Sequence, residues 1–266
     1  MAWGAGDFGG GLSSRRAPVY GVVLVSQVTG MLASFATAGA LHEQLLGPSD
    51  LAVCAVAGVL GAVGIVMLYR GLAIGRMGIV APVTGVLAAV IPVLAGFVTE
   101  GIPGPVVVIG IAIAVVAVIL VSRVADESGG PSGLPEALIG GTTIGLFGVA
   151  IAQLSQGNVF MALGSIRLVQ GVLVVAMVIV LRATWRPKAS LLPALVVVGL
   201  LDTAGNALYL LAVQTGQLAI ASVLSAMYPV VTIILAMAFL REPISRDHTI
   251  GIVLAAVAIA LIASGG

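Results

Sequence analysis

Long apolar segments, separated by short polar or glycine- and proline-containing connections, run through the whole chain. Only 8% of the residues are charged and 60% are hydrophobic, whereas soluble globular domains carry about 25% charged residues. Each apolar segment except the first is close to the ~20 residues that a transmembrane helix needs. The segments are rich in Ala, Leu and Gly and lack the two-residue alternation of a membrane β-barrel. The sequence therefore predicts an all-α integral membrane protein.

We expect ten transmembrane helices, five in each half of the chain. The first, residues 1–14, is short, because at 1.5 Å per residue it covers only about 21 Å of a hydrocarbon core of about 30 Å. The other nine are predicted at residues 19–41, 51–70, 78–99, 104–122, 136–156, 160–182, 191–212, 219–240 and 248–264.

The two halves of the chain resemble each other at a nearly constant spacing. Tyr69 and Tyr209 end similar stretches (209 − 69 = 140), and Gln27 and Arg167 lie at matching depths of two further segments (167 − 27 = 140). Such a repeat is the pattern of membrane transporters built from two related halves. We expect one membrane domain made of two repeats, 1–125 and 136–266, joined by a polar linker, 126–135.

The basic residues predict the orientation of the helices. Of the 11 Lys and Arg residues, all except Arg167 lie in odd-numbered connections. Because Lys and Arg are concentrated in cytoplasmic loops, the odd-numbered connections are expected in the cytoplasm and the C-terminus outside. Five helices per half is an odd number, so the second repeat would be inverted relative to the first. Arg167, a few residues into its helix, is expected to extend to the outer surface rather than to pair with an acid.

The C-terminal part of the chain carries a recognisable signature. Tyr228-Pro229 followed by Glu242-Pro243 lies within residues 219–264. This segment closely resembles the last two helices of EamA-type carriers of the drug/metabolite transporter superfamily. The opening sequence, WGAGDFGGGLSSRR, resembles the first helix of the family, although that helix is short here. The resemblance implies export or exchange of small solutes such as amino acids, sugars or drugs.

Two aspartates are predicted near the middle of the bilayer. Asp7 is about 12 Å along its helix from Arg15, and Asp202 is about 16 Å into the eighth helix. A carboxylate at the bilayer centre costs about 2.5–3.5 kcal/mol, so it is found mainly where it faces a partner or a wet cavity. We interpret both as candidates for binding substrate or protons. The alternative is a structural role, in which Asn206 satisfies Asp202 one turn away.

At helical spacing, further polar or aromatic side chains lie on the same helix faces as the two aspartates. Asp202 is followed by an amide at i+4 and a phenol at i+7, and Trp3 lies on the same face as Asp7. In the ninth helix, small and hydroxyl side chains form a stripe that either lines a cavity or allows close helix packing. The predicted binding and coupling residues are Trp3, Asp7, Asp202, Asn206, Tyr209, Ser225 and Tyr228.

Prolines interrupt the fourth and ninth helices. Pro82 and Pro92 in the fourth correspond to Pro229 in the ninth, and breaks at matching places in two halves indicate a substrate site or hinge. The alternative is that they are tolerated kinks, because membrane helices carry more proline than soluble ones. We predict that the three prolines act as hinges.

Other classes of site are poorly represented in the sequence. Gly4 to Gly9 matches the dinucleotide-binding pattern, but no strand precedes it, and Gly6 and Gly10 are better explained as helix contacts. One Cys and two His residues give no metal-ligand pattern. We expect no metal and no cofactor, and the net charge of +1 without a basic patch argues against nucleic acid.

We therefore expect a secondary transporter of the cytoplasmic membrane rather than an enzyme. It would export a small solute by alternating access, coupled to protons through Asp202 together with Asp7. A facilitator or exchanger without proton coupling is the alternative, and an intramembrane enzyme that uses the two aspartates is a third. The expected partners are a small-molecule substrate, the lipid bilayer and protons, and the protein would work as a monomer or a homodimer.

Overall fold

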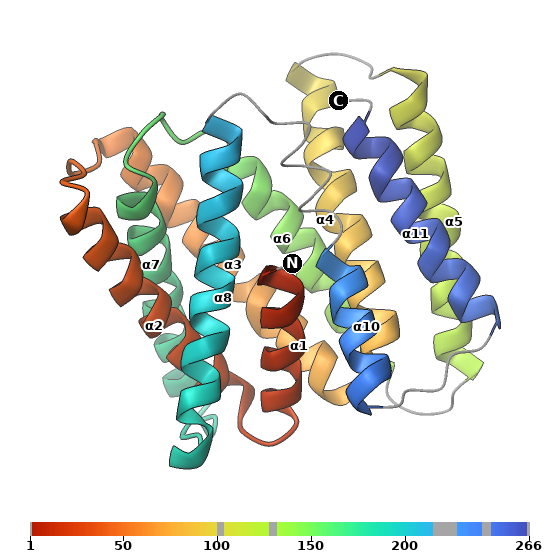
Figure 1. The fold of residues 1–266 in the computed structure, drawn as a ribbon, viewed down its shortest axis with the longest axis horizontal. Coiled ribbons are helices and arrows are strands. Elements are labelled where there is room, and N and C mark those ends of the chain that lie inside the picture. The colour runs from red at the N-terminus through yellow and green to blue at the C-terminus, as the bar shows by residue number, and fades with distance from the viewer. Residues whose placement is uncertain (1, 100–103, 128–131, 215–227, 241–245, 265–266) are drawn as a thin grey trace.

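The computed structural model describes residues 2–99, 104–127, 132–214, 228–240 and 246–264. Within these ranges the regular structure is entirely helical (Figure 1). The first half contains α1 (Ala2–Ser14), α2 (Val19–Ala40), α3 (Pro48–Ile74), α4 (Met77–Thr99) and α5 (Pro105–Glu127). The second half contains α6 (Leu134–Ile151), α7 (Val159–Val180), the short 3-10 helix η1 (Ala189–Leu191), α8 (Leu192–Gln214), α10 (Tyr228–Leu240) and α11 (Arg246–Ser264).

The predicted all-α membrane architecture is confirmed, and every predicted helix has a counterpart. Five helical segments among the described residues are long and apolar enough to cross a membrane: α2, α3, α6, α7 and the segment Ala189–Leu211. Helix α1 has only 13 residues, and Figure 1 shows that it begins near mid-height of the bundle. Of the predicted helix 219–240, the part before Tyr228 lies outside the described residues.

The predicted polar linker is shorter than expected. Helix α5 continues to Glu127 and α6 already begins at Leu134, so residues 126, 127, 134 and 135 are helical. Pro135 fits the first turn of α6 because the first N–H groups of a helix have no intrahelical partner. Glu136 in the same turn is favoured by the helix dipole.

The packing pattern is similar when each helix of the first half is exchanged with its counterpart in the second half. The counterparts are α1 and α6, α2 and α7, α3 and α8, α4 and α10, and α5 and α11. Helix α1 packs on α8 as α6 packs on α3, and α2 packs on α8 as α7 packs on α3. Likewise, α4 packs on α6 as α10 packs on α1, while the equivalent helices α2 and α7, and α5 and α11, pack on each other. Figure 1 also shows the described odd-numbered connections at one end of the bundle and the even-numbered ones at the other. This arrangement fits the predicted repeat, whose boundaries and relative orientation stay predictions.

Helix α1 is positioned by close contacts with α3 and α8. The backbone at Gly6 lies against α8, where a Cβ would be 3.6 Å from the amide nitrogen of Asp202. A Cβ at Gly10 would overlap the ring of Tyr69 on α3. The predicted role in close helix contact is therefore confirmed at Gly10, whereas a Cβ at Gly6 would make an ordinary van der Waals contact with α8. Asp7, between these two glycines, is buried.

Candidate functional site

A buried ion pair joins α7 and α8 inside the bundle. Nη2 of Arg167 donates a hydrogen bond of 2.8 Å to Oδ2 of Asp202, and Nη1 donates one of 2.8 Å to Oε1 of Gln27 on α2. The Arg167 side chain is only 3% exposed. The expectation that Arg167 extends to the outer surface is therefore wrong. The carboxylate and the amide replace part of the water that a guanidinium loses on burial, while Nε of Arg167 is buried without a hydrogen-bond partner among the described residues.

The backbone of α2 leaves room for this guanidinium at Gly30. A Cβ at Gly30 would overlap the hydroxyl oxygen of Thr203 on α8 and would lie 2.7 Å from both Cδ and Nε of Arg167. Any larger residue would have to displace Thr203 and the arginine or move the helices apart. The ion pair thus depends on a glycine that carries no chemistry of its own.

Asp202 has a second partner on its own helix. Nδ2 of Asn206 donates to the backbone oxygen of Asp202 at 2.9 Å and lies 3.4 Å from Oδ1. The structural alternative for Asp202 is therefore present in part, but the guanidinium is its principal partner. Protonation of Asp202 would leave Arg167 as an uncompensated buried cation, which is strongly unfavourable.

Asp7 differs from Asp202, although both are enclosed by the bundle. Its exposed fraction is 7%, and no described residue donates a hydrogen bond to its carboxylate or forms an ion pair with it. The charged group that acts on it most strongly is Asp202, another acid. Two carboxylates and one guanidinium leave one negative charge uncompensated when both acids are ionised. A buried charge without a partner is expensive, so this position favours a bound proton or cation.

Three aromatic rings from three helices meet on the same side of α1. The ring centroid of Trp3 is 5.7 Å from that of Tyr209 on α8 and 6.1 Å from that of Tyr228 on α10. Trp3 can lie against α8 because residue 205 is glycine, where a Cβ would be 2.6 Å from Nε1 of the indole. Three of the predicted site residues, Trp3, Tyr209 and Tyr228, therefore meet around the start of α1, and Asp7 follows Trp3 by about one helical turn.

Two phenol hydroxyl groups face this region without a partner. The hydroxyl groups of Tyr69 and Tyr228 are buried, and neither has a hydrogen bond within the described part of the chain. The charge of Asp7 acts on both of them. The hydroxyl group of Ser26 on α2 is a neighbour of the Tyr69 phenol.

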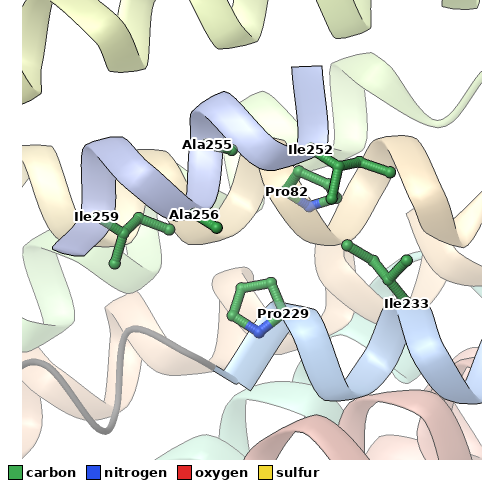
Figure 2. A pocket seen from close by; sticks show the side chains of 7 residues that line it. All are labelled: Pro82, Pro229, Ile233, Ile252, Ala255, Ala256 and Ile259. Atoms are coloured by element: carbon green, nitrogen blue, oxygen red, sulfur yellow. The ribbon is translucent and has the colours of Figure 1, made fainter. Parts of the chain in front are cut away.

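Two of the three predicted hinge prolines face each other. Figure 2 shows Pro82 of α4 and Pro229 of α10 on opposite sides of a small apolar pocket, which α11 closes with Ile252, Ala255, Ala256 and Ile259. Pro92 lies apart from them, with its Cγ 3.6 Å from the position of a Cβ at Gly148 on α6. Ser225, the remaining predicted residue, lies outside the described residues.

Three residues of the site were missed as site residues by the sequence analysis: Gln27, Tyr69 and Arg167. Their signal was present, because each has a polar counterpart 140 residues away in the other half. Gln27 and Arg167 are counterparts of each other and are joined by a hydrogen bond. Two equivalent positions of a repeat contact each other only near the axis that relates the copies. Among the described residues, no group of three or more His, Cys, Asp or Glu residues is placed to hold a metal ion.

The fold is that of a helical membrane protein, and the comparison with protein families shows its class to be a transporter. Residues 131–264, half of the chain, match the EamA-like transporter family. The chain therefore belongs to this family, which is a branch of the drug/metabolite transporters.

The comparison with solved structures agrees with this class at the level of fold. One crystal structure, of a protein with no further description, aligns with 98% of this chain and 95% of its own at a TM-score of 0.65 and 16% identity. At this identity the likeness shows the fold alone. None of the curated proteins matches the chain.

Proposed function

We propose that this EamA-like transporter exports a small solute by alternating access and takes up a proton at Asp7 in exchange. The observation that carries the proposal is the buried carboxylate of Asp7, which has no partner and lies beside an ion pair that is already neutral. A carboxylate in this position is suited to bind one positive charge and to release it when its surroundings change.

We propose Asp7 as the coupling residue in place of Asp202. Asp202 is held by Arg167, so a proton that binds there breaks an ion pair. A proton that binds to Asp7 removes an uncompensated charge instead. The titratable and charged groups around Asp7 come from three neighbouring helices: Tyr69 on α3, Asp202 and Tyr209 on α8, and Tyr228 on α10, with Arg167 of α7 behind Asp202.

The helices around Asp7 come from both halves of the chain, which suits alternating access. Helices α1 and α3 belong to the first half, and α8 and α10 to the second. A rocking of one half against the other would open the site to one side and close it to the other, as in other transporters built from repeats. Pro82 and Pro229 lie where α4 and α10 approach each other (Figure 2), which is a suitable place for such a hinge.

The test is transport by purified protein in liposomes that contain a pH-sensitive dye. A thermal-shift screen of amino acids, nucleosides, sugars and organic cations first selects a solute. We expect its counterflow to alkalinise the proton-donating side, and we expect Asp7→Asn to abolish this pH change. Asp50→Asn is the matched control, because among the described residues Asp50 binds the exposed backbone N–H and hydroxyl group of Ser155.

Two outcomes separate the proposal from its alternative. Proton-driven flux that is unchanged in Asp7→Asn contradicts the assignment of Asp7. Flux that ignores an imposed pH gradient but responds to solute on the opposite side indicates the facilitator or exchanger.

A further inference from the structure

We propose that the connection between α1 and α2 and the connection between α7 and η1 together bind the headgroups of anionic phospholipids. This inference goes beyond the proposed function, because it concerns neither Asp7 nor the transported solute. Exposed cations, an aromatic residue beside them and the lack of a nearby acid carry it.

The two connections hold cations that have no acidic neighbour in the sequence. The cations are Arg16, Arg182, Arg186 and Lys188. All of them are exposed, and within the described part of the chain none of them forms an ion pair. Residues 14–21 and 181–192 contain no Asp or Glu. By contrast, Arg70, near the same end of the bundle, is paired with Glu136 at 3.3 Å.

The two connections lie side by side, although they come from different halves of the chain. A Cβ at Gly21, in the first turn of α2, would overlap the backbone oxygen of Trp185 and lie 3.0 Å from Cδ of Pro187. Figure 1 shows both connections at the same end of the bundle. The four cations are therefore gathered in one region at this end.

An aromatic side chain places this region at the level of the lipid headgroups. Trp185 is 40% exposed, and Trp is enriched where the hydrocarbon core meets water. Cζ of Arg186 lies 5.5 Å from the centroid of a Trp185 ring, within the distance at which a ring attracts a cation. This contact holds the guanidinium beside the indole, at the depth where lipid phosphates lie.

The equivalent connection of the first half, at the opposite end of the bundle, supplies its own anion. Both connections begin with the same turn, in which Arg182 (φ 47°) corresponds to His42 (φ 54°) (182 − 42 = 140). The next residue there is Glu43, whose carboxylate accepts hydrogen bonds of 2.7 and 3.2 Å from backbone N–H groups at the start of α7. Its counterpart is Ala183 (183 − 43 = 140), and no side chain caps the start of α2. The end of the bundle that carries the cations thus lacks the acid that the other end has.

An anionic phospholipid supplies this missing charge at the right depth. Arg and Lys side chains bind phosphate groups, and each Lys or Arg near an anionic membrane surface adds to the attraction. A zwitterionic lipid also carries a phosphate, but its own cation opposes the cations of the protein. Since the odd-numbered connections are expected in the cytoplasm, the site would face the leaflet whose surface potential is negative.

The chain offers an optical test, because it contains two tryptophans. Trp3→Phe leaves Trp185 as the sole indole, and bromine atoms on lipid acyl chains quench the emission of an indole that they contact. We would reconstitute this full-length variant into mixed bilayers of phosphatidylglycerol and phosphatidylcholine, with bromine on one of the two lipids at a time. We expect phosphatidylglycerol to be enriched about fivefold beside Trp185. This preference should largely disappear when salt is raised from about 0.05 M to about 1 M.

Variants in the Trp3→Phe background separate the proposed site from the general charge of this end. Arg182→Gln/Arg186→Gln/Lys188→Gln should remove the preference, and Arg186→Gln alone should lower it by about twofold. Arg70→Gln is the matched control and should leave the preference unchanged, because Arg70 already has an acidic partner. Each variant is its own reference, since the preference is the ratio of quenching by the two brominated lipids.

Inorganic phosphate shares the chemistry of the headgroup and tests whether a lipid is the ligand. Exchange of chloride for phosphate at constant ionic strength should not change the preference, because free phosphate lacks the acyl chains that keep a lipid beside Trp185. Loss of the preference in phosphate would show that the site binds a soluble anion, and it would overturn the inference.

Two further outcomes would also contradict the lipid site. One is equal quenching by the two lipids in the parent variant, and the other is a preference that persists in the folded triple variant. Circular dichroism establishes that each variant is folded. None of these results depends on proton coupling at Asp7, which the transport assay tests separately.

Discussion

Asp202 and Asp7 are the same residue type inside the same bundle, but their surroundings differ. Asp202 lies where α2, α7 and α8 meet and is bound by Arg167 at 2.8 Å. Asp7 lies on short α1, against α3, α8 and α10, and no described residue binds its carboxylate. The comparison separates two uses of a carboxylate within a membrane. One helps to hold the helices together, and the other is left free for a mobile positive charge.

The largest loss of folding free energy is expected when one partner of the Arg167–Asp202 ion pair is removed. Arg167→Met leaves Asp202 as an uncompensated buried charge, and such changes cost about 3–5 kcal/mol of folding free energy. The double variant Arg167→Met/Asp202→Leu should recover most of this loss, because it removes both charges. Denaturant unfolding in detergent measures the unfolding free energies of the single and the double variant. A double variant no more stable than the single one would show that the pair is not what stabilises this region.

A smaller loss of folding free energy is expected from a substitution at Gly30. Gly30→Ala places a methyl group 2.7 Å from Cδ and Nε of Arg167, and overpacking of this kind costs about 1–3 kcal/mol. Gly171→Ala on α7 is the matched control, since a Cβ there has no neighbour within 4 Å. The control should gain roughly 0.5–1 kcal/mol from its better helix propensity. Equal unfolding free energies for the two variants would contradict the described packing of Thr203 and Arg167 against Gly30.

Asp7→Asn should hardly destabilise the fold, in contrast to changes at the ion pair. Removal of a charge without a partner relieves a desolvation cost, so we expect stability that is unchanged or raised by up to about 1 kcal/mol. Thermal unfolding followed by circular dichroism measures this. A loss as large as that in Arg167→Met would show that Asp7 has a structural partner.

The smallest effects are expected from substitutions at the prolines, and they concern the rate of solute transport alone. Pro82→Ala and Pro229→Ala should lower solute flux by about threefold if hinge motion limits transport, whereas Pro92→Ala, which lies away from the shared pocket, should have less effect. Initial rates of uptake into liposomes compare the three. Equal rates in all three variants would favour the interpretation of these prolines as tolerated kinks.

Most of the helical plan was predictable, because length and apolarity alone define a membrane helix. The ends of α5 and α6 were not, since polar residues such as Glu127 and Glu136 continue or start a helix at the membrane surface as readily as they form a loop. The helical spacing also predicted which residues share a face, including Trp3 with Asp7 and Asp202 with Asn206. Depth and face along one helix follow from sequence.

The contacts between helices were not predictable in this way. Arg167 is eight residues into α7 (167 − 159 = 8), about 12 Å, a depth similar to that estimated for Asp7. That depth argued against a position at the outer surface, but it did not reveal Asp202 as the partner. A single sequence says which residues lie at one level of the membrane and not which helices face each other there. Only the packing of α7 against α2 and α3, and of α8 against α2 and α1, brings the residues of the site together.

The difference between the two aspartates is tested most directly by infrared difference spectroscopy during a pH titration. A protonated carboxyl group gives a C=O stretching band that disappears when the group ionises, and buried groups absorb apart from exposed ones. We expect wild-type protein to show a titrating band that is lost in Asp7→Asn and retained in Asp202→Asn. A band that is retained in Asp7→Asn and lost in Asp202→Asn would contradict the account, because the proton would then be carried by the acid that is paired with Arg167.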